Sequence, residues 1–314
     1  MKMSISLPLP GRCPDGTIAA CDRFAQVGEE SGFHAISASD HPFPYLGEGS
    51  SSHQALDPFA LLAYLAAKTT RIRLQFSLLV AAYRNPFLSA RMLATLDQAS
   101  SGRVMATLGA GYNRQEFAAL GASFDARGEQ VVDVVTAMEA AWTGDPVFAE
   151  GRGWRATGNV LEPGCIQQPR LPLWRGGNSK AAQRQAAATF DGWAPLEVSD
   201  ERALRVDTTG LTLRSIEGAV SRFGEMWDEH GRPGRPDVCF VRTRTDWLSE
   251  EDRIVSEVWA LAEAGVTWIE FTPAGDSVGA AEESMRATSD ILSGAGLLAQ
   301  PWPGNVASSP APCT

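Results

Sequence analysis

The sequence predicts an α/β protein folded as a (β/α)8 TIM barrel. Short apolar runs typical of strands alternate with stretches that have the 3.6-residue spacing of helices, and this alternation repeats through eight strands. The connections are too short to form a separate domain, and 314 residues suit one barrel with a large core. The alternative, a two-domain doubly wound protein, would need a reversal in strand order, which a sequence cannot reveal.

The elements of the first half follow from hydrophobic period and from helix-start signals. Asp57-Pro58 and Asn85-Pro86 mark helix starts, with Asp57 as the N-cap and proline at the first helical position. Four strands are predicted, at residues 4–9, 33–38, 72–79 and 103–109. Helices are predicted after them, at residues 17–31, 57–67, 85–99 and 115–142.

The second half repeats the same alternation after an interruption. Residues 143–170 break the pattern, and we expect an insertion between the fourth and fifth units, on the face where barrels build active sites. Further strands are predicted at residues 171–174, 192–196, 238–243 and 266–271, and helices at 179–189, 212–230, 250–264 and 278–292. Residues 1–299 then form one domain, and the proline-rich residues 300–314 form a disordered tail.

Composition and charge exclude several classes of protein. Apolar residues make up 44% and charged residues 20%, which disfavours disorder and fibrous repeats. Lys plus Arg number 27 and Asp plus Glu 37, so the formal net charge of −10 disfavours partners such as nucleic acid or an anionic membrane. Five cysteines without a CxxC pair argue against disulfides and zinc. We expect a soluble cytoplasmic protein with a small-molecule substrate and no metal.

An acid and an imidazole follow the second strand. Asp40 and His41 could fix a tautomer, bind a polar ligand or exchange a proton, and an aromatic loop with Phe43 and Tyr45 comes next. The alternative is a simple turn in which Asp40 bonds its own backbone. The remaining histidines lie mid-strand or in polar sequence and show no metal-ligand spacing: His34, His53 and His230.

The third and fourth strands end in an apolar ledge and a glycine turn. Residues 77–82 could pack against a planar ring, although spacing alone favours buried strand. Gly109 and Gly111 begin like a dinucleotide fingerprint, but Arg114 occupies the third glycine position. The turn is better explained as a close backbone approach to a ligand, with Glu116 as a helix cap or a functional carboxylate.

Consecutive glycines follow the fifth strand and lead directly into a helix. Gly176 and Gly177 let the backbone approach a ligand, and the unpaired N–H groups of the helix start favour an anion such as phosphate. Arg175 strengthens this interpretation. The alternative is an ordinary turn with Ser179 as the N-cap.

Taken in order, these motifs resemble the bacterial luciferase-like family, and most nearly its branch that uses the deazaflavin coenzyme F420. The resemblance is strong over residues 30–197 and is carried by "SDHPF", "RNPFLSARMLATLDQASSGRV", "LGAGYNRQEFAALGASFDARGEQV" and "LPLWRGGNSKAAQRQAAATFDGWAPL". It implies a luciferase-like TIM barrel that binds F420, or alternatively FMN, at its carboxyl face. A homodimer is expected from the resemblance only.

The resemblance also implies the site residues. Asp40 and His41 would be catalytic, and the bond between Ser77 and Leu78 would match the family's non-prolyl cis peptide, which supports the ring. The expected cofactor contacts are Asp40, Ser77, Leu78, Gly111, Tyr112, Gly176, Gly177, Asn178 and Ser179. The candidates for an apolar substrate pocket beside His41 are Phe43, Tyr45, Tyr112 and Trp174.

One departure from the family narrows the function. Sugar-phosphate dehydrogenases of the F420 branch have a catalytic glutamate after the glycine turn, where this chain has Arg114, with Glu116 two residues later. We therefore expect an F420-dependent oxidoreductase that moves a hydride between the deazaflavin C5 and a small organic substrate other than a sugar phosphate. The alternatives are an FMN-dependent monooxygenase that uses reduced flavin and oxygen, and a flavin-binding relative without catalytic activity.

Overall fold

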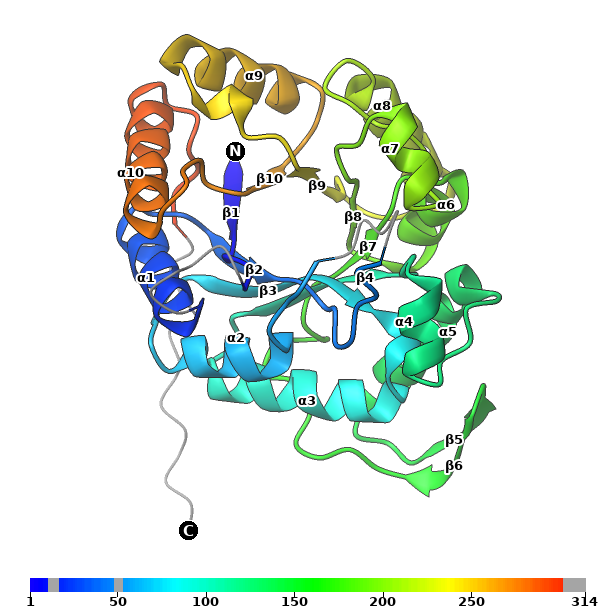
Figure 1. Ribbon diagram of the computed structural model, residues 1–314. Helices are drawn as coiled ribbons and strands as arrows, with labels where there is room; N and C mark the ends of the chain where they lie inside the picture. Colours follow the sequence, from blue (N-terminus) through cyan, green and yellow to red (C-terminus); the bar gives the residue numbers. More distant parts are fainter. Residues whose placement is uncertain (11–16, 48–52, 302–314) are drawn as a thin grey trace.

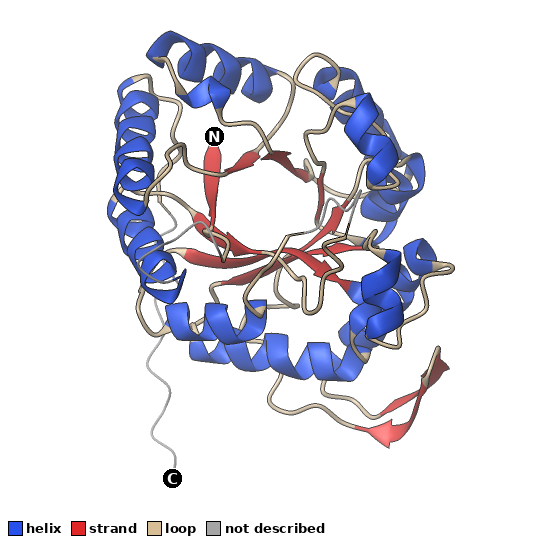
Figure 2. Ribbon diagram, viewed as in Figure 1, coloured by secondary structure: helices blue, strands red, loops and turns tan. Residues whose placement is uncertain are grey.

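The computed structural model describes residues 1–10, 17–47 and 53–301, and its strands close into a parallel barrel (Figure 1). Figure 2 shows the strands as an inner ring and the helices around it. In chain order the barrel strands are β1 (Lys2–Ser6), β2 (Ala35–Ala38), β3 (Arg73–Val80), β4 (Val104–Gly109), β7 (Leu173–Gly176), β8 (Gly192–Ala194), β9 (Asp237–Arg242) and β10 (Trp268–Phe271). Strand β1 pairs with β10 and β2, which closes the ring and confirms the predicted (β/α)8 barrel.

Helices cover the outside of the barrel. The predicted starts of two of them are confirmed: the Asp57 side chain accepts a hydrogen bond from Ala60 N, and the Asn85 side chain accepts one from Phe87 N. The helices are α1 (Thr17–Glu30), α2 (Pro58–Ala66), α3 (Pro86–Ala99), α4 (Arg114–Ala119), α5 (Arg127–Trp142), α6 (Lys180–Thr189), α7 (Asp200–Arg205), α8 (Ile216–Glu229), α9 (Glu251–Glu263) and α10 (Val278–Gly294).

The single helix predicted over residues 115–142 is wrong, because the chain forms two helices there. Gly121 and Ala126 have positive φ angles of 67° and 56°, which stop α4 and separate it from α5. Helix α7 was not predicted. It is six residues long and capped by Ser199, and such a short helix leaves almost no periodic signal.

The insertion forms an antiparallel hairpin of β5 (Val147–Gly151) and β6 (Trp154–Asn159), which projects beyond the ring of helices (Figure 1). The segment after it packs at the amino ends of the strands, where the Gln167 side chain donates to Val104 O and to Asp97 Oδ1, both at 2.7 Å. The expected position on the active-site face is therefore wrong. An insertion between a helix and the next strand falls at the opposite end of a barrel.

The core has two parts. A large apolar layer packs between the strands and the surrounding helices, and a small cluster fills the barrel interior. The interior cluster consists of Ala35, Met105, Trp174, Ala194, Cys239 and Trp268. In the part of the chain that is described, no helix combines the length and apolar character needed to cross a bilayer.

His34 links β2 to the end of the described chain. Its Nδ1 accepts a hydrogen bond from Met3 N at 3.1 Å, so Nε2 carries the hydrogen and donates to Gln300 O at 3.2 Å. Gln300 is the first residue of the predicted tail and is held here. Residues 302–314, the remainder of that tail, lie outside the described residues.

Acid should destabilise the fold through His34. Burial lowers the pKa of His34 from 6.5 to about 4, so the unfolded chain binds a proton between these values and the folded chain does not. Stability is then complete above pH 6.5 and decreases as the pH falls toward 4, by up to about 3 kcal/mol. Urea unfolding of wild type and of His34→Gln, which keeps one acceptor and one donor, measures this as a shallower pH slope in the variant. His230→Gln, at an exposed histidine, is the matched control and should keep the wild-type slope.

Candidate functional site

The carboxyl ends of the eight barrel strands enclose a cavity of about 1160 Å³. Most of the side chains predicted for the site line it, although they come from four different strand ends. The predicted residues on its wall are Asp40, His41, Ser77, Leu78, Gly111, Tyr112, Gly176, Gly177, Asn178 and Ser179. The structure thus brings together the predicted catalytic residues, ring contacts and phosphate loop in one cavity.

Asp40 is buried and its carboxylate is fully engaged. Arg84 donates to both oxygens at 2.7 Å, and Val80 N donates to Oδ2 at 3.0 Å. A bidentate pair with arginine and a backbone hydrogen bond therefore engage both oxygens of this carboxylate. Asp40 ties the end of β2 to the segment after β3, and so sets the position of the neighbouring His41.

His41 is paired with Glu116, which comes from the first turn of α4. The two side chains meet at 2.9 Å between Nδ1 and Oε2, and Glu116 also accepts from Tyr83 Oη at 3.0 Å and from Phe43 N at 3.1 Å. Burial raises the pKa of Glu116, but the hydrogen bonds from His41, Phe43 and Tyr83 outweigh it, so the pKa lies below its ordinary value. Burial and the adjacent Glu116 raise the pKa of Tyr83, which therefore stays protonated.

This pairing defines the tautomer of His41. Because Glu116 is ionised, Nδ1 must donate to it, and Nε2 is the ring nitrogen that can give or take a proton in the cavity. The ring is flanked edge-on by Tyr112 at 5.8 Å and His53 at 4.7 Å between ring centroids. Histidine, carboxylate and phenol together form a unit suited to proton transfer.

Position 114 is an arginine, and the carboxylate that pairs with His41 comes from Glu116. The Arg114 side chain is exposed, and its guanidinium stacks over Phe124 at 4.0 Å, outside the cavity. Glu116 faces inward because Asn113 caps α4 by accepting from Glu116 N at 3.1 Å. The sequence marked Glu116 only as a cap or carboxylate. Its partnership with His41, 75 residues earlier in the chain, carries no local signal.

Leu78 forms one wall of the cavity. The peptide bond between Ser77 and Leu78 is cis, as the resemblance implies, and the register of β3 against β4 shifts at this point. The Leu78 side chain lies against two glycines: a Cβ would approach it within 2.5 Å at Gly109 and 2.9 Å at Gly176. These glycines are therefore required for the wall. The apolar ledge is in part buried strand, since Leu79 and Ala81 are buried, while Ser77, Leu78 and Val80 of β3 line the cavity.

The glycine turn before α6 is held by its own side chains. Gly177 has a φ of +113°, and Ser179 caps the helix by accepting from Ala182 N at 3.1 Å. The amide of Asn178 donates to Leu196 O and to a second backbone carbonyl at 2.8 Å each. Asn178 and Ser179 thus fix the shape of the turn, and its backbone lines the cavity.

Arg175 is a buried cation at this end of the cavity. It is 3% exposed, and it donates to the Gln185 side chain at 2.9 Å and to Gly176 O. Within the described residues no carboxylate pairs with it, and burial lowers its pKa to about 10. A buried charge without a counter-ion is unfavourable unless an anion binds it. The turn and Arg175 therefore fit a phosphate group. The buried Thr107 hydroxyl on the cavity wall has no hydrogen-bond partner among the residues that the structure describes.

Three of the predicted substrate-pocket residues do not reach the cavity. Phe43 and Tyr45 are 69% and 45% exposed, and the backbone N–H of Phe43 donates to Glu116. Trp174 is 1% exposed and packs against Trp268 in the barrel interior, with 5.3 Å between ring centroids. It lies two residues before Gly176 on β7, hence on the same face but one layer deeper. Tyr112 is the member of this group that lines the cavity.

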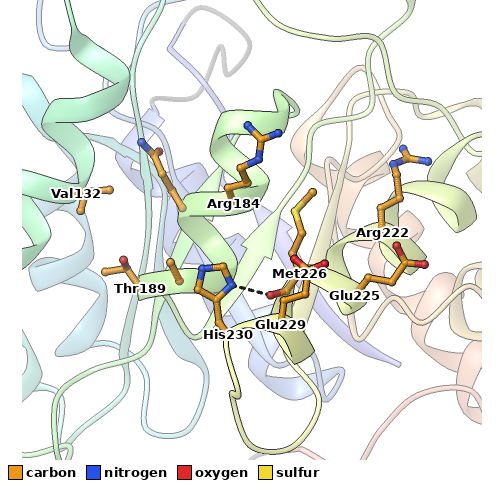
Figure 3. A pocket seen from close by; sticks show the side chains of 10 residues that line it. Val132, Arg184, Thr189, Arg222, Glu225, Met226, Glu229 and His230 are labelled. Atoms are coloured by element: carbon orange, nitrogen blue, oxygen red, sulfur yellow. Dashed lines mark hydrogen bonds between the residues drawn. The ribbon is translucent and has the colours of Figure 1, made fainter.

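A second hollow of about 590 Å³ lies on the outer surface between α5, α6 and α8 (Figure 3). In it His230 donates from Nδ1 to Met226 O at 2.8 Å, and charged side chains such as Arg222 and Glu225 surround it. It does not reach the strand ends. Among the described residues, no group of three or more His, Cys, Asp or Glu side chains is arranged to hold a metal ion.

Comparison with known proteins places this geometry in a family. The family model described as "Luciferase-like monooxygenase" matches residues 3–290. The oxygenase component of a flavin-dependent trigonelline monooxygenase from Acinetobacter baylyi is 25% identical over 74% of this chain, and an F420-dependent glucose-6-phosphate dehydrogenase from Microbacterium testaceum is 26% identical over 66%. The chain spans 60% of the length of each of these two relatives.

A solved structure shows the same fold. The monooxygenase RslO1 from Streptomyces bottropensis matches with a TM-score of 0.77 and 20% identity, covering 94% of this chain and 100% of that one. Its alignment covers almost the whole barrel. Together with the family match over nearly the full length, this shows that the chain belongs to the luciferase-like monooxygenase family.

Proposed function

We propose that this chain is an F420-dependent oxidoreductase, which moves a hydride between the deazaflavin C5 and a small organic substrate. The observation that carries the proposal is the His41–Glu116 pair, in which His41 lines the cavity and the buried Glu116 pairs with its Nδ1. Hydride transfer to a carbonyl group, or from an alcohol, needs a proton donor or acceptor beside the reacting carbon. The similarity to F420-dependent glucose-6-phosphate dehydrogenase supports this choice of cofactor.

The residues divide into three tasks in this proposal. The backbone turn from Gly176 to Ser179, together with Arg175, holds the cofactor phosphate, and Leu78 supports the ring. The bound cofactor supplies the hydride chemistry. His41 moves the proton through Nε2, while Glu116 and Tyr83 keep its tautomer fixed. Asp40 acts through position, because Arg84 occupies its carboxylate.

The second candidate is an FMN-dependent monooxygenase that uses reduced flavin and oxygen. The similarity to the trigonelline monooxygenase component supports it, and the same phosphate turn and ring wall would serve FMN. A third candidate is a flavin-binding relative without catalysis. In that case the His41–Glu116 pair would have no chemical task, so the pair favours the two enzymatic candidates over this one.

A fluorescence titration separates the candidates. We expect purified protein to quench F420 fluorescence on binding and to bind FMN more weakly. Tight FMN binding without F420 binding, followed by oxygen uptake with reduced FMN, would establish the monooxygenase instead. His41→Ala distinguishes an enzyme from a non-catalytic binder, because only the former loses turnover while keeping cofactor affinity.

Product analysis separates the two enzymatic candidates. The phosphate turn would bind either cofactor, whereas hydride transfer and oxygenation give different products. A panel of small alcohols and ketones with F420 therefore reports on the first candidate, and product analysis for an added oxygen atom reports on the second. Neither product in the presence of tight binding would favour the third.

A further inference from the structure

The barrel interior at the floor of the cavity carries a set of polar side chains. Barrel interiors of this fold are usually filled with branched apolar side chains. Here β1, β2, β3, β4, β9 and β10 place hydroxyl, amide, thiol and carboxyl groups in that layer. Its polar members are Ser6, Ser37, Gln75, Thr107, Cys239 and Glu270. This layer is a part of the molecule to which the proposed function gives no task.

Glu270 is the carboxyl group at its centre. Oε1 accepts from Ser37 Oγ at 2.7 Å and from Ser6 Oγ at 3.3 Å, while Oε2 accepts from Gln75 Nε2 at 3.0 Å. The side chain is 3% exposed, and that small exposed area faces the cavity, whose wall includes Glu270 and Ser77. The carboxyl group therefore connects three neighbouring strands and reaches the space above them.

No positive charge balances Glu270. Within the described residues, lysine, arginine and histidine side chains form no ion pair with it. The groups that face it from β1, β2 and β3 are hydroxyls and an amide, and the titratable group facing it from β9 is the thiol of Cys239. Burial raises the pKa of that thiol, so Cys239 is uncharged too.

Burial without a counter-ion within the described residues disfavours the charged form of Glu270. Burial raises the pKa of Glu270 above its ordinary value, and the hydrogen bonds from Ser77, Ser37, Ser6 and Gln75 offset only part of this effect. Two further atoms of the layer, Gln75 Oε1 and Thr107 Oγ1, are buried and find no partner in the described part of the chain. A protonated carboxyl group can donate a hydrogen bond, which an ionised one cannot.

We propose that Glu270 is a positioning residue that presents an uncharged floor to the bound ring, so that loss of its proton weakens binding of the reduced cofactor. The inference rests on the proposed function, because it assumes that a flavin or deazaflavin ring occupies this cavity. Reduced rings of both kinds carry negative charge once their N1 position is deprotonated. A carboxylate in the dry floor would repel that charge strongly, whereas a carboxylic acid would not.

The test measures binding of reduced FMN and reduced F420, without oxygen, to wild type and to Glu270→Gln. Glutamine keeps the size of the acid and cannot ionise. We expect the ratio of wild-type to E270Q affinity to fall about tenfold between about pH 6 and about pH 9, because each pKa unit of coupling is a factor of ten. Glu283→Gln, at an exposed glutamate of α10, is the matched control and should keep the wild-type pH dependence.

A constant ratio across this range would overturn the inference. Should E270Q fail to fold, Ser37→Ala provides the second test: it removes the 2.7 Å hydrogen bond to the carboxyl group and should move the wild-type transition to higher pH. An unmoved transition would also overturn the inference. If wild type binds neither reduced cofactor at any pH, the proposed function has failed, which is distinct from binding that ignores Glu270.

Discussion

Replacing Glu116 by glutamine should lower turnover about a hundredfold, at the lower end of what general acid–base catalysis contributes. The carboxylate is buried and accepts from His41, Tyr83 and Phe43 N. A carboxamide cannot carry the negative charge that fixes Nδ1 of His41 as a donor, so the wrong tautomer becomes accessible. Single-turnover oxidation of the reduced cofactor by substrate measures this step directly.

Cofactor affinity is the readout that isolates the effect of Glu116. Because Glu116 lies at the proton-transfer side and not at the phosphate turn, Glu116→Gln should keep the wild-type Kd for the cofactor. Glu283→Gln controls for the loss of a carboxylate elsewhere and should keep full turnover. Unchanged turnover in E116Q would remove the His41–Glu116 pair from the proposed chemistry.

Replacing Arg175 by methionine should weaken cofactor binding by tens to about a hundredfold, since a buried hydrogen bond to a charged group contributes about 1.5–3 kcal/mol. Arg175 is buried, lines the cavity beside the glycine turn and has no carboxylate partner within the described residues. Binding of a phosphate would provide the missing counter-charge. Isothermal titration with FMN and with F420 measures the loss for both cofactors.

Thermal unfolding separates this effect from damage to the fold. Inorganic phosphate or cofactor should raise the Tm of wild type, because a ligand that binds the folded state stabilises it. R175M should lose most of that increase. Lys180→Met, at an exposed cation on the first residue of α6, should keep it. An equal rise in Tm for R175M and wild type would contradict a phosphate site at Arg175.

The fold could be predicted wherever the signal was local. The aspartate before Pro58 caps its helix as expected, and the helix predicted to start at Asn85-Pro86 does so with Asn85 as its cap, because these signals need only residues a few positions apart. The break between α4 and α5 was missed, since helical hydrophobic spacing continues across it. One of the two residues with positive φ at this break is Ala126, and alanine rarely adopts that region.

The residue types of the site could be predicted from the sequence. The depth at which each side chain lies in the barrel, and which side chains pair with one another, could not. Strand ends identified Asp40, His41 and the glycine turn, which do line the cavity. Sequence position could not show that Arg84 forms an ion pair with the Asp40 carboxylate, because the two residues are 44 positions apart and meet only in the closed barrel. Nor could it show that Trp174 lies below the cavity in the barrel interior. The alternation of side chains along a strand predicts which face a residue is on, but not how far down the barrel the cavity extends.

The hairpin of β5 and β6 offers an attachment point for immobilising the protein. Its turn at Arg152 and Gly153 is exposed, and the insertion packs at the amino ends of the strands, opposite the cavity. An affinity tag, a fluorophore or a surface linker placed in this turn would leave the cavity mouth facing solution. Immobilised in that orientation, the protein could be exchanged repeatedly between buffers, cofactors and candidate substrates.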